Sequence, residues 1–214
     1  IAAVRADAKA LTSQIADITS NGGGRNLLVG SIPSDKNHLN GWSMDNGWVG
    51  THAFLDDGTT KMFVLTNSTT KENFLWSPYV LLENGETYTL SYYAFATINT
   101  ASYSGEVYAV NSNYSETQQI ANPKKLSESK ATRYVYTFAF SKPSGKYRFR
   151  FDNNGSTNGK TASMFIGKPM LEEGMVAHAW QPALEDTDAK ITTNTAAIEQ
   201  NKKAITLKAD QTTV

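Results

Sequence analysis

Two groups of side chains in this sequence combine aromatic rings with polar partners. The first is the segment 41–52, which holds Trp42, Trp48 and His52 among glycine, aspartate and asparagine. Sugar rings stack their apolar C–H face on flat aromatic rings, while sugar hydroxyls pair with amides, carboxylates and guanidinium groups. Loops of this kind often carry binding residues. We therefore predict that this segment contacts a saccharide. The alternative is that one tryptophan packs beneath the loop as a core residue.

The second group is Arg148, Arg150 and Asp152, which alternate with aromatic residues along the segment 146–152. Successive side chains of a strand point to opposite faces of a sheet, so these charged groups point outward if the aromatic rings point inward. They could hydrogen-bond sugar hydroxyls, or pair with the phosphate or uronate of a cell-wall polymer. The alternative is a solvated sheet face on which arginine stems cover their neighbours.

Tyr93 and Phe95 lie on the polar side of their own predicted strand. They would add a stacking surface beside the arginines if that strand neighbours 146–152 in the same sheet, because exposed aromatic rings there are hard to explain by packing alone. Three tyrosines are further loop or edge candidates, namely Tyr103, Tyr108 and Tyr114. Trp76 lies in an apolar run and is predicted to be a core residue.

Catalysis has little support in the sequence. The histidines His38, His52 and His178 are not spaced as metal ligands, and no His-Glu-x-x-His or Gly-x-Ser-x-Gly motif is present. The glycine-containing run 154–161 lacks the first glycine of a phosphate loop, since Asn154 stands at that position. The absence of cysteine excludes disulfides, thiolate chemistry and cysteine-ligated zinc. We predict that the protein is not an enzyme.

The composition of the chain limits the classes of binding partner that we expect. The 214 residues carry a formal net charge of zero, so there is no electrostatic footprint for nucleic acid or an acidic membrane. No signal peptide and no apolar run long enough to cross a membrane are present, which predicts no membrane insertion. The chain begins at Ile1 in a helical pattern, and we interpret it as a fragment of a longer protein.

The candidate residues fall in a region that alternates with a period of two, from residue 26 to about 184. Turn residues separate its strand-like runs, and no helical segment interrupts them, which favours antiparallel sheets packed face to face. The fold class that follows is mainly β, a jelly-roll-type sandwich. The predicted strands are 61–65, 74–82, 88–95, 105–111, 134–140, 146–152 and 162–171.

Helical patterns flank this region. Across 1–20 the apolar residues, among them Leu11, Ile15 and Ile18, are spaced alternately by three and four, as in the seam of a coiled coil. The glycine-rich stretch 21–25 then ends the helix and predicts a hinge between a stalk and a head at 26–184.

A second coiled coil is predicted over 185–214. A seven-residue repeat places isoleucine at the a positions and asparagine at the d positions, in the order Ile191, Asn194, Ile198, Asn201 and Ile205. Three facing asparagines can satisfy one another around an ion or water, so this polarity favours three strands over two. The alternative is an amphipathic helix that packs on its own domain.

Motifs at both ends of the β region resemble a known family. They are the opening Asn26-Leu27-Leu28 and the endings Leu171-Glu-Glu-Gly174 and Ala177-His-Ala-Trp180-Gln-Pro182-Ala183. They resemble the carbohydrate-binding jelly-roll modules of tail fibres and tail-associated proteins from phages of Gram-positive bacteria, with His178 where such sequences more often carry threonine. The run 191–198 looks like the asparagine-layer motif of trimeric bacterial and phage fibre stalks.

The resemblance covers about three quarters of the chain and implies a receptor-binding module of the virion that attaches to host cell-surface polysaccharide without cleaving it. Its partners would be two further copies of the chain and other tail proteins, and three heads would add avidity. No cofactor is expected; a structural calcium ion occurs in such sandwiches, but no run of spaced acidic residues locates one here. Two alternatives are a structural spacer of a tail fibre and a fragment of a cell-wall polysaccharide hydrolase.

Overall fold

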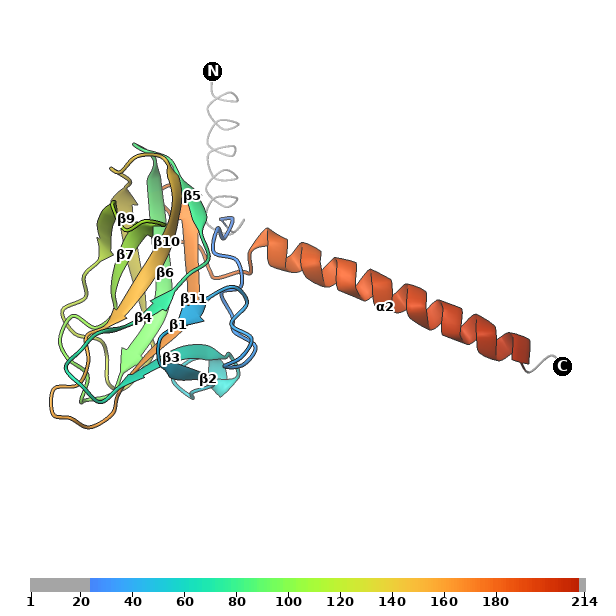
Figure 1. The fold of residues 1–214 in the computed structure, drawn as a ribbon, viewed down its shortest axis with the longest axis horizontal. Coiled ribbons are helices and arrows are strands. Elements are labelled where there is room, and N and C mark those ends of the chain that lie inside the picture. Colours follow the sequence, from blue (N-terminus) through green and yellow to red (C-terminus); the bar gives the residue numbers. More distant parts are fainter. Residues whose placement is uncertain (1–23, 212–214) are drawn as a thin grey trace, which may run out of the picture.

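The structure is a computed structural model that describes residues 24–211, and it shows a β-sandwich from which one long helix extends (Figure 1). The helix predicted over 1–20, with Leu11, Ile15 and Ile18, lies outside the described residues, as does most of the hinge 21–25.

Two antiparallel sheets form the sandwich. The six-stranded sheet has the order β1 (Ser43–Met44), β4 (Asn73–Trp76), β10 (Gly145–Asn153), β7 (Glu106–Asn111) and β8 (Thr117–Ala121), with β5 (Val80–Leu82) also paired to β10. The five-stranded sheet has the order β2 (Gly47–Gly50), β3 (Met62–Asn67), β11 (Ala162–Glu173), β6 (Thr87–Ala96) and β9 (Thr132–Ala139). A short 3-10 helix, η1 (Asp56–Gly58), joins β2 to β3. The predicted antiparallel sandwich is confirmed.

The core lies between the sheets and follows the alternation of the sequence. Phe149 and Phe151 of β10 are fully buried against Leu90 and Tyr92 of β6 in one cluster. Burying a large apolar side chain stabilises the fold by about 1.5–3 kcal/mol relative to exposure. The inward direction of these rings turns the intervening charged residues of β10 outward.

The run 74–82 forms two strands, where the sequence predicted one. Ser77 ends β4, because its backbone N–H donates to Phe149 O and its hydroxyl accepts the N–H of Phe149, at 2.9 and 2.8 Å. Pro78 then follows and has no N–H for a sheet ladder. The strand β8 was missed because Thr117–Ala121 has neither aromatic rings nor clear alternation, and β1 and β2 lie in a segment predicted as loop.

The motifs at the two ends of the β region, around Asn26 and Trp180, are joined to each other by hydrogen bonds. The side-chain oxygen of Asn26 accepts the N–H groups of Leu28 and Leu171 at 2.9 and 3.2 Å, and its amide donates to Gln181 O at 3.0 Å. The indole of Trp180 donates to the hydroxyl of Ser31 at 3.2 Å. A side chain that satisfies three backbone groups explains why asparagine opens the domain.

After these hydrogen-bonded end segments, α2 (Leu184–Gln211) extends away from the sandwich (Figure 1). Its first turn is anchored, since Asp186 accepts the N–H of Gly30 at 3.0 Å and Glu185 pairs with Arg25. Further along, the isoleucines at 191, 198 and 205 are 57%, 64% and 68% exposed, so the helix does not pack them on its own domain. Within 24–211 no helix is long and apolar enough to cross a membrane.

Candidate functional site

Apart from Trp42, the sequence-predicted site residues lie on two opposite outer faces of the sandwich. Tyr93 and Phe95 belong to β6, which pairs with β11 and β9 in the five-stranded sheet. Arg148 and Arg150 belong to β10, which pairs with β4, β5 and β7 in the other sheet. The expectation that these two pairs would share one surface is therefore wrong. Pairing between strands far apart in the sequence determines which sheet each strand joins. The alternation within a single strand carries no information about that pairing.

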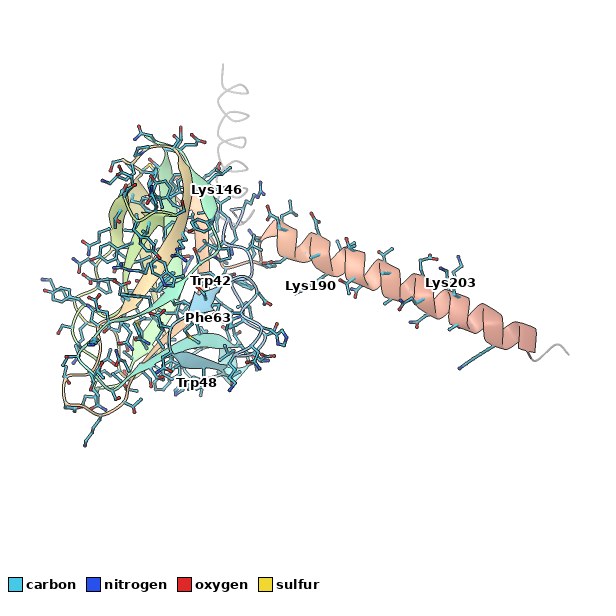
Figure 2. All side chains as sticks on the ribbon, viewed as in Figure 1. Trp42, Trp48, Phe63, Lys146, Lys190 and Lys203 are labelled. Carbon is cyan, nitrogen blue, oxygen red and sulfur yellow. The ribbon has the colours of Figure 1, made fainter. Side chains whose placement is uncertain are left out.

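Trp42 lies in the core and offers no ring face to a ligand. Its ring packs 4.9 Å from Phe63, and its indole N–H donates to Val29 O at 2.9 Å. Figure 2 shows Trp42 beside Phe63 within the sandwich, and Trp48, on β2, near the lower end of the domain. The packing alternative holds for Trp42, which is corrected from a predicted ligand contact to a core residue.

The outer face of the five-stranded sheet carries an apolar row. Trp48, Val64, Phe165 and Phe95 are successive cross-strand neighbours on β2, β3, β11 and β6. Phe95 and Phe165 stack with centroids 4.2 Å apart and are only 3% and 6% exposed. His52 covers them, with its ring 4.7 Å from that of Phe95. Phe95 is therefore buried beneath the 52–55 segment and unavailable for stacking.

Trp48 is the open end of this row. A Cβ on Gly50 would lie 2.2 Å from the Trp48 ring, so the glycine lets the indole lie over the strand. The ring meets Phe165 edge-on at 5.7 Å, and Trp48 remains 41% exposed. The Nδ1 atom of His52 accepts the N–H of Phe54 at 3.2 Å, so Nε2 is the ring nitrogen that takes no part in that bond. Tyr93 is half-buried nearby on the same face.

The outer face of the six-stranded sheet is different, because its row mixes aromatic and polar side chains. Trp76, Arg150, Tyr108 and Gln119 are successive cross-strand neighbours on β4, β10, β7 and β8. Trp76 is buried, as predicted, at 9% exposed, but it does not lie between the sheets: Leu75 takes the inward position, and Trp76 lies on the outer face beneath the arginines. We call this surface the arginine face, and define it as Phe74, Trp76, Tyr79, Tyr108, Tyr114, Arg148, Arg150 and Asp152.

Arg150 and Asp152 form a bidentate pair on this face. Nε and Nη2 of Arg150 donate to the two carboxylate oxygens at 2.7 and 2.6 Å, and the guanidinium lies 4.6 Å from the Phe74 ring and 4.8 Å from the Tyr108 ring. Such a fork fixes the direction of both side chains. The pair therefore presents a charged but locally neutralised hydrogen-bonding group between two rings.

Burial strongly perturbs this pair. Asp152 is 1% exposed, and desolvation raises its pKa to about 7, against the lowering effect of Arg150 and with a further contribution from Glu72 and Glu106. Burial acts to lower the pKa of Arg150, but the hydrogen bonds and charge of Asp152 outweigh it and raise that pKa. The protonation state of Asp152 consequently changes near neutral pH, and the net charge of the arginine face changes with it.

Arg148 lies above Trp76, with its guanidinium carbon 3.9 Å from the ring centroid. Tyr79 and Tyr114 flank it at 5.6 and 5.5 Å, and Nη2 donates to the Tyr114 hydroxyl. Three rings around one cation make a site of strong cation–π attraction. Tyr79 and Phe74 were missed as site residues because the run 74–82 was interpreted as one buried strand; Pro78 was the signal that the strand breaks there.

Other potential sites are less developed. Within residues 24–211 no group of three or more metal-ligating side chains comes together. A hollow of about 350 Å³ lies between the base of α2 and the head, lined by residues such as Ile32, Trp180 and Lys190. Its lining includes polar side chains such as Asn40 and Asp186 but one aromatic residue, Trp180, whose N–H is already bonded to Ser31, so it lacks the several rings of the arginine face.

No protein-family model matches this chain, and no curated protein matches its sequence. Similar solved structures include a "Family 16 Carbohydrate Binding Module-2", with 21% identity, a TM-score of 0.48 and coverage of 68% of this chain and 99% of that one. The CBM22-1 xylan-binding domain of Paenibacillus barcinonensis Xyn10C has 16% identity, a TM-score of 0.48 and coverage of 72% and 98%. The tripod from the baseplate of bacteriophage Tuc2009 has 15% identity, a TM-score of 0.44 and coverage of 77% and 60%.

The neighbours are thus carbohydrate-binding modules and a phage baseplate protein. At these identities and TM-scores the likeness does not reveal the ligand, so the function of this chain has to be argued from its own residues.

Proposed function

We propose that the arginine face binds a polysaccharide on the host cell surface and does not cleave it. The observation that carries the proposal is the row Trp76–Arg150–Tyr108, in which ring faces flank a fixed guanidinium–carboxylate pair. Ring faces accept the apolar side of a pyranose, and Arg150, whose side chain is 23% exposed, offers the guanidinium donors that Asp152 does not engage to its hydroxyls. The open rings of this face are Tyr79 and Tyr114, at 45% and 59% exposed, and a purely structural sheet face would gain little from them.

The non-catalytic part of the proposal rests on the carboxylates of this face. Glycosidases use two carboxyl groups on opposite sides of the scissile bond. Here Asp152 is buried and engaged in both oxygens by Arg150, and Glu106 is bonded to Gln119 and Asn154. Asp152 is only 1% exposed, so its carboxyl does not reach a glycosidic oxygen at the surface in this arrangement, which supports binding without hydrolysis.

A second, smaller contact surface is proposed at Trp48 and His52 on the opposite face. The indole over Gly50 provides one open ring, and His52 packs on the same Phe165 ring as Trp48 does. It lacks an arginine–carboxylate pair, so we expect a weaker contribution than that of the arginine face.

We further propose that α2 forms a homotrimeric coiled coil in the tail of a phage of Gram-positive bacteria, where the protein assembles with other tail proteins in the virion. The exposed isoleucines 191, 198 and 205 support this, because they leave an apolar seam along a helix that stands away from its own head. Leu184 continues the seam at the same seven-residue spacing and is also exposed. Three weak sites on one stalk raise apparent affinity by ~10²–10⁴ on a repeating receptor.

The test is retention on immobilised host cell-wall polysaccharide, measured for the full chain and for Trp76→Ala, Arg150→Ala and the control Lys146→Ala. Lys146 is exposed on the same strand but outside the arginine face. We expect both site variants to lose retention while the control keeps it. Equal retention of all four would favour the spacer alternative, and release of reducing sugars from the cell wall would establish a hydrolase.

The avidity part has its own test. Ile198→Glu in the full chain places a charge in the proposed seam and should give monomers by light scattering. On a dense polysaccharide the monomer should bind at least ~100-fold more weakly than the wild type. Equal apparent affinity would remove avidity from the proposal.

A further inference from the structure

The two arginines of the arginine face differ in one respect that bears on the ligand. The Nε and Nη2 atoms of a guanidinium form one edge that matches the two oxygens of a carboxylate or phosphate. In Arg150 this edge is occupied by both oxygens of Asp152. In Arg148 the same edge has the Tyr114 hydroxyl on Nη2 and no acceptor on Nε among the described residues.

Arg148 also has no charge partner. Across residues 24–211 no carboxylate lies within ion-pair distance of its guanidinium. The nearby acids are engaged elsewhere, since Glu116 pairs with Lys142 at 3.4 Å and Asp152 pairs with Arg150. A buried donor without an acceptor costs free energy, and the cost is larger for a charged group. Arg148 is thus held by three rings but lacks the anion that its neighbour has.

Tyr114 stands over this edge on an exposed turn. Its backbone is in the left-handed region, at φ 61°, and side-chain bonds between Asn111, Asn113 and Ser115 hold the turn. The hydroxyl of Tyr114 is a single neutral acceptor where the guanidinium edge can take two charged oxygens. A ligand oxygen pair that displaces this hydroxyl would gain one hydrogen bond and a charge interaction, while the rings of Tyr79 and Tyr114 flank the sugar that carries the anion.

We propose that Arg148 is the subsite for an anionic substituent, a carboxylate or phosphate, so that the preferred ligand is an acidic polysaccharide. The inference rests on the saccharide-binding function proposed above and narrows its ligand class. The Nε–Nη2 edge of Arg148 takes two oxygens of the anion, the indole of Trp76 supports the guanidinium from below, and the Arg150–Asp152 pair meets the hydroxyls of the adjoining sugar.

The experiment compares polymers that differ only in charge. Polygalacturonate and its carboxyl-reduced form share one backbone, and poly(glycerol phosphate) tests phosphate as the anion. For the wild-type chain, calorimetry should give tenfold to hundredfold (roughly) tighter binding to at least one anionic polymer than to the reduced one. Raising the salt concentration should weaken binding to the anionic polymer alone.

Variants distinguish specific recognition by the Nε–Nη2 edge of Arg148 from nonspecific attraction by positive charge. Arg148→Gln should abolish the preference for the anion and keep the weaker binding to the reduced polymer, whereas Lys146→Gln removes the same charge from the same strand and should change neither. Arg148→Lys keeps the charge without the fork and should recover only part of the preference. Tyr114→Phe removes the competing hydroxyl and should increase the preference. Thermal unfolding of each variant checks that it is folded.

Two results would overturn the inference while the proposed function stands: equal affinity of the wild type for acidic and reduced polymers, or a loss in Lys146→Gln as large as that in Arg148→Gln. Failure of the wild type to bind any of the three polymers, or the cell-wall polysaccharide itself, would overturn the proposed function and the inference together.

Discussion

The two outer faces of the sandwich are each crossed by a row of aromatic side chains, yet they offer different surfaces. On the five-stranded sheet the row ends in Phe165 and Phe95, which stack on each other beneath His52. On the six-stranded sheet an arginine stands between Trp76 and Tyr108, and its carboxylate partner fixes its direction. Apolar neighbours collapse onto one another and leave no polar group at the surface, whereas the charged pair keeps its hydrogen bonds and leaves arginines at the surface above Trp76, which is itself only 9% exposed. Polar spacing between rings therefore distinguishes a binding face better than the number of rings.

The largest expected effect is on stability and belongs to the covered row. Phe95→Ala removes a buried ring that stacks on Phe165 and should lower the free energy of unfolding by about 3–5 kcal/mol. Chemical denaturation measures it. Affinity of the folded protein for polysaccharide should stay within about twofold, and a larger loss would mean that the covered row takes part in binding.

The next effect is a pH dependence confined to the arginine face. Burial raises the pKa of Asp152 to about 7 from 3.8, so between those values the folded chain keeps a proton that the unfolded chain loses. The stabilising contribution of that proton is complete below about pH 4 and is lost as pH rises through 7, a change of a few kcal/mol at most.

Asp152→Asn provides the control for this pH effect. The difference in unfolding free energy between wild type and variant should become less favourable to the wild type from pH 4 to pH 8. Asp56 behaves in the opposite sense, because its hydrogen bond with Lys168 lowers its pKa. A wild-type-minus-variant difference that is flat across the window would contradict the buried, proton-retaining state of Asp152.

Binding should separate the faces next. Trp76→Ala removes the ring that supports Arg148 and should weaken polysaccharide binding by about 2 kcal/mol, or ~30-fold. Titration calorimetry on the folded variant measures the change. If Trp76→Ala binds polysaccharide as tightly as the wild type does, the arginine face is not the binding face.

The smallest effect is expected at Trp48, the one open ring of the covered row. Trp48→Ala should weaken polysaccharide binding by only about 0.5–1 kcal/mol, because no fixed hydrogen-bonding pair accompanies that ring. Direct comparison with Trp76→Ala in the same assay ranks the two faces. A larger loss for Trp48→Ala would reverse the assignment and make the opposite face the principal contact.

Local sequence patterns predicted much of the fold. The alternation in 146–152 correctly placed Tyr147, Phe149 and Phe151 inward and the charged residues outward, and the same reasoning separated the two sides of β6. Turn residues were expected between the strand-like runs, and Gly85 adopts φ 86° in the turn after β5. These features depend on residues close in the chain, where side-chain direction follows from backbone geometry alone.

The composition of the site depended on longer-range pairing. Trp42 and Trp48 lie six residues apart in one polar segment, yet one packs against Phe63 and the other lies open over Gly50. Trp76 sits in an apolar run but faces outward, because Leu75 is the residue that meets the core. The neighbouring residues in the sequence do not distinguish these positions, since the burial of each side chain depends on which strand pairs or packs next to it.

By itself, the sequence determined which residues of each strand share a face, where the β region begins and ends, and which helix positions carry isoleucine and asparagine. Only the tertiary structure decided that β6 and β10 belong to different sheets, and with it that Arg148 and Arg150 have Trp76 and Tyr108 as neighbours instead of Tyr93 and Phe95. Side-chain direction is a property of one strand's backbone, whereas the choice of neighbour is made by the packing of all strands around a common core.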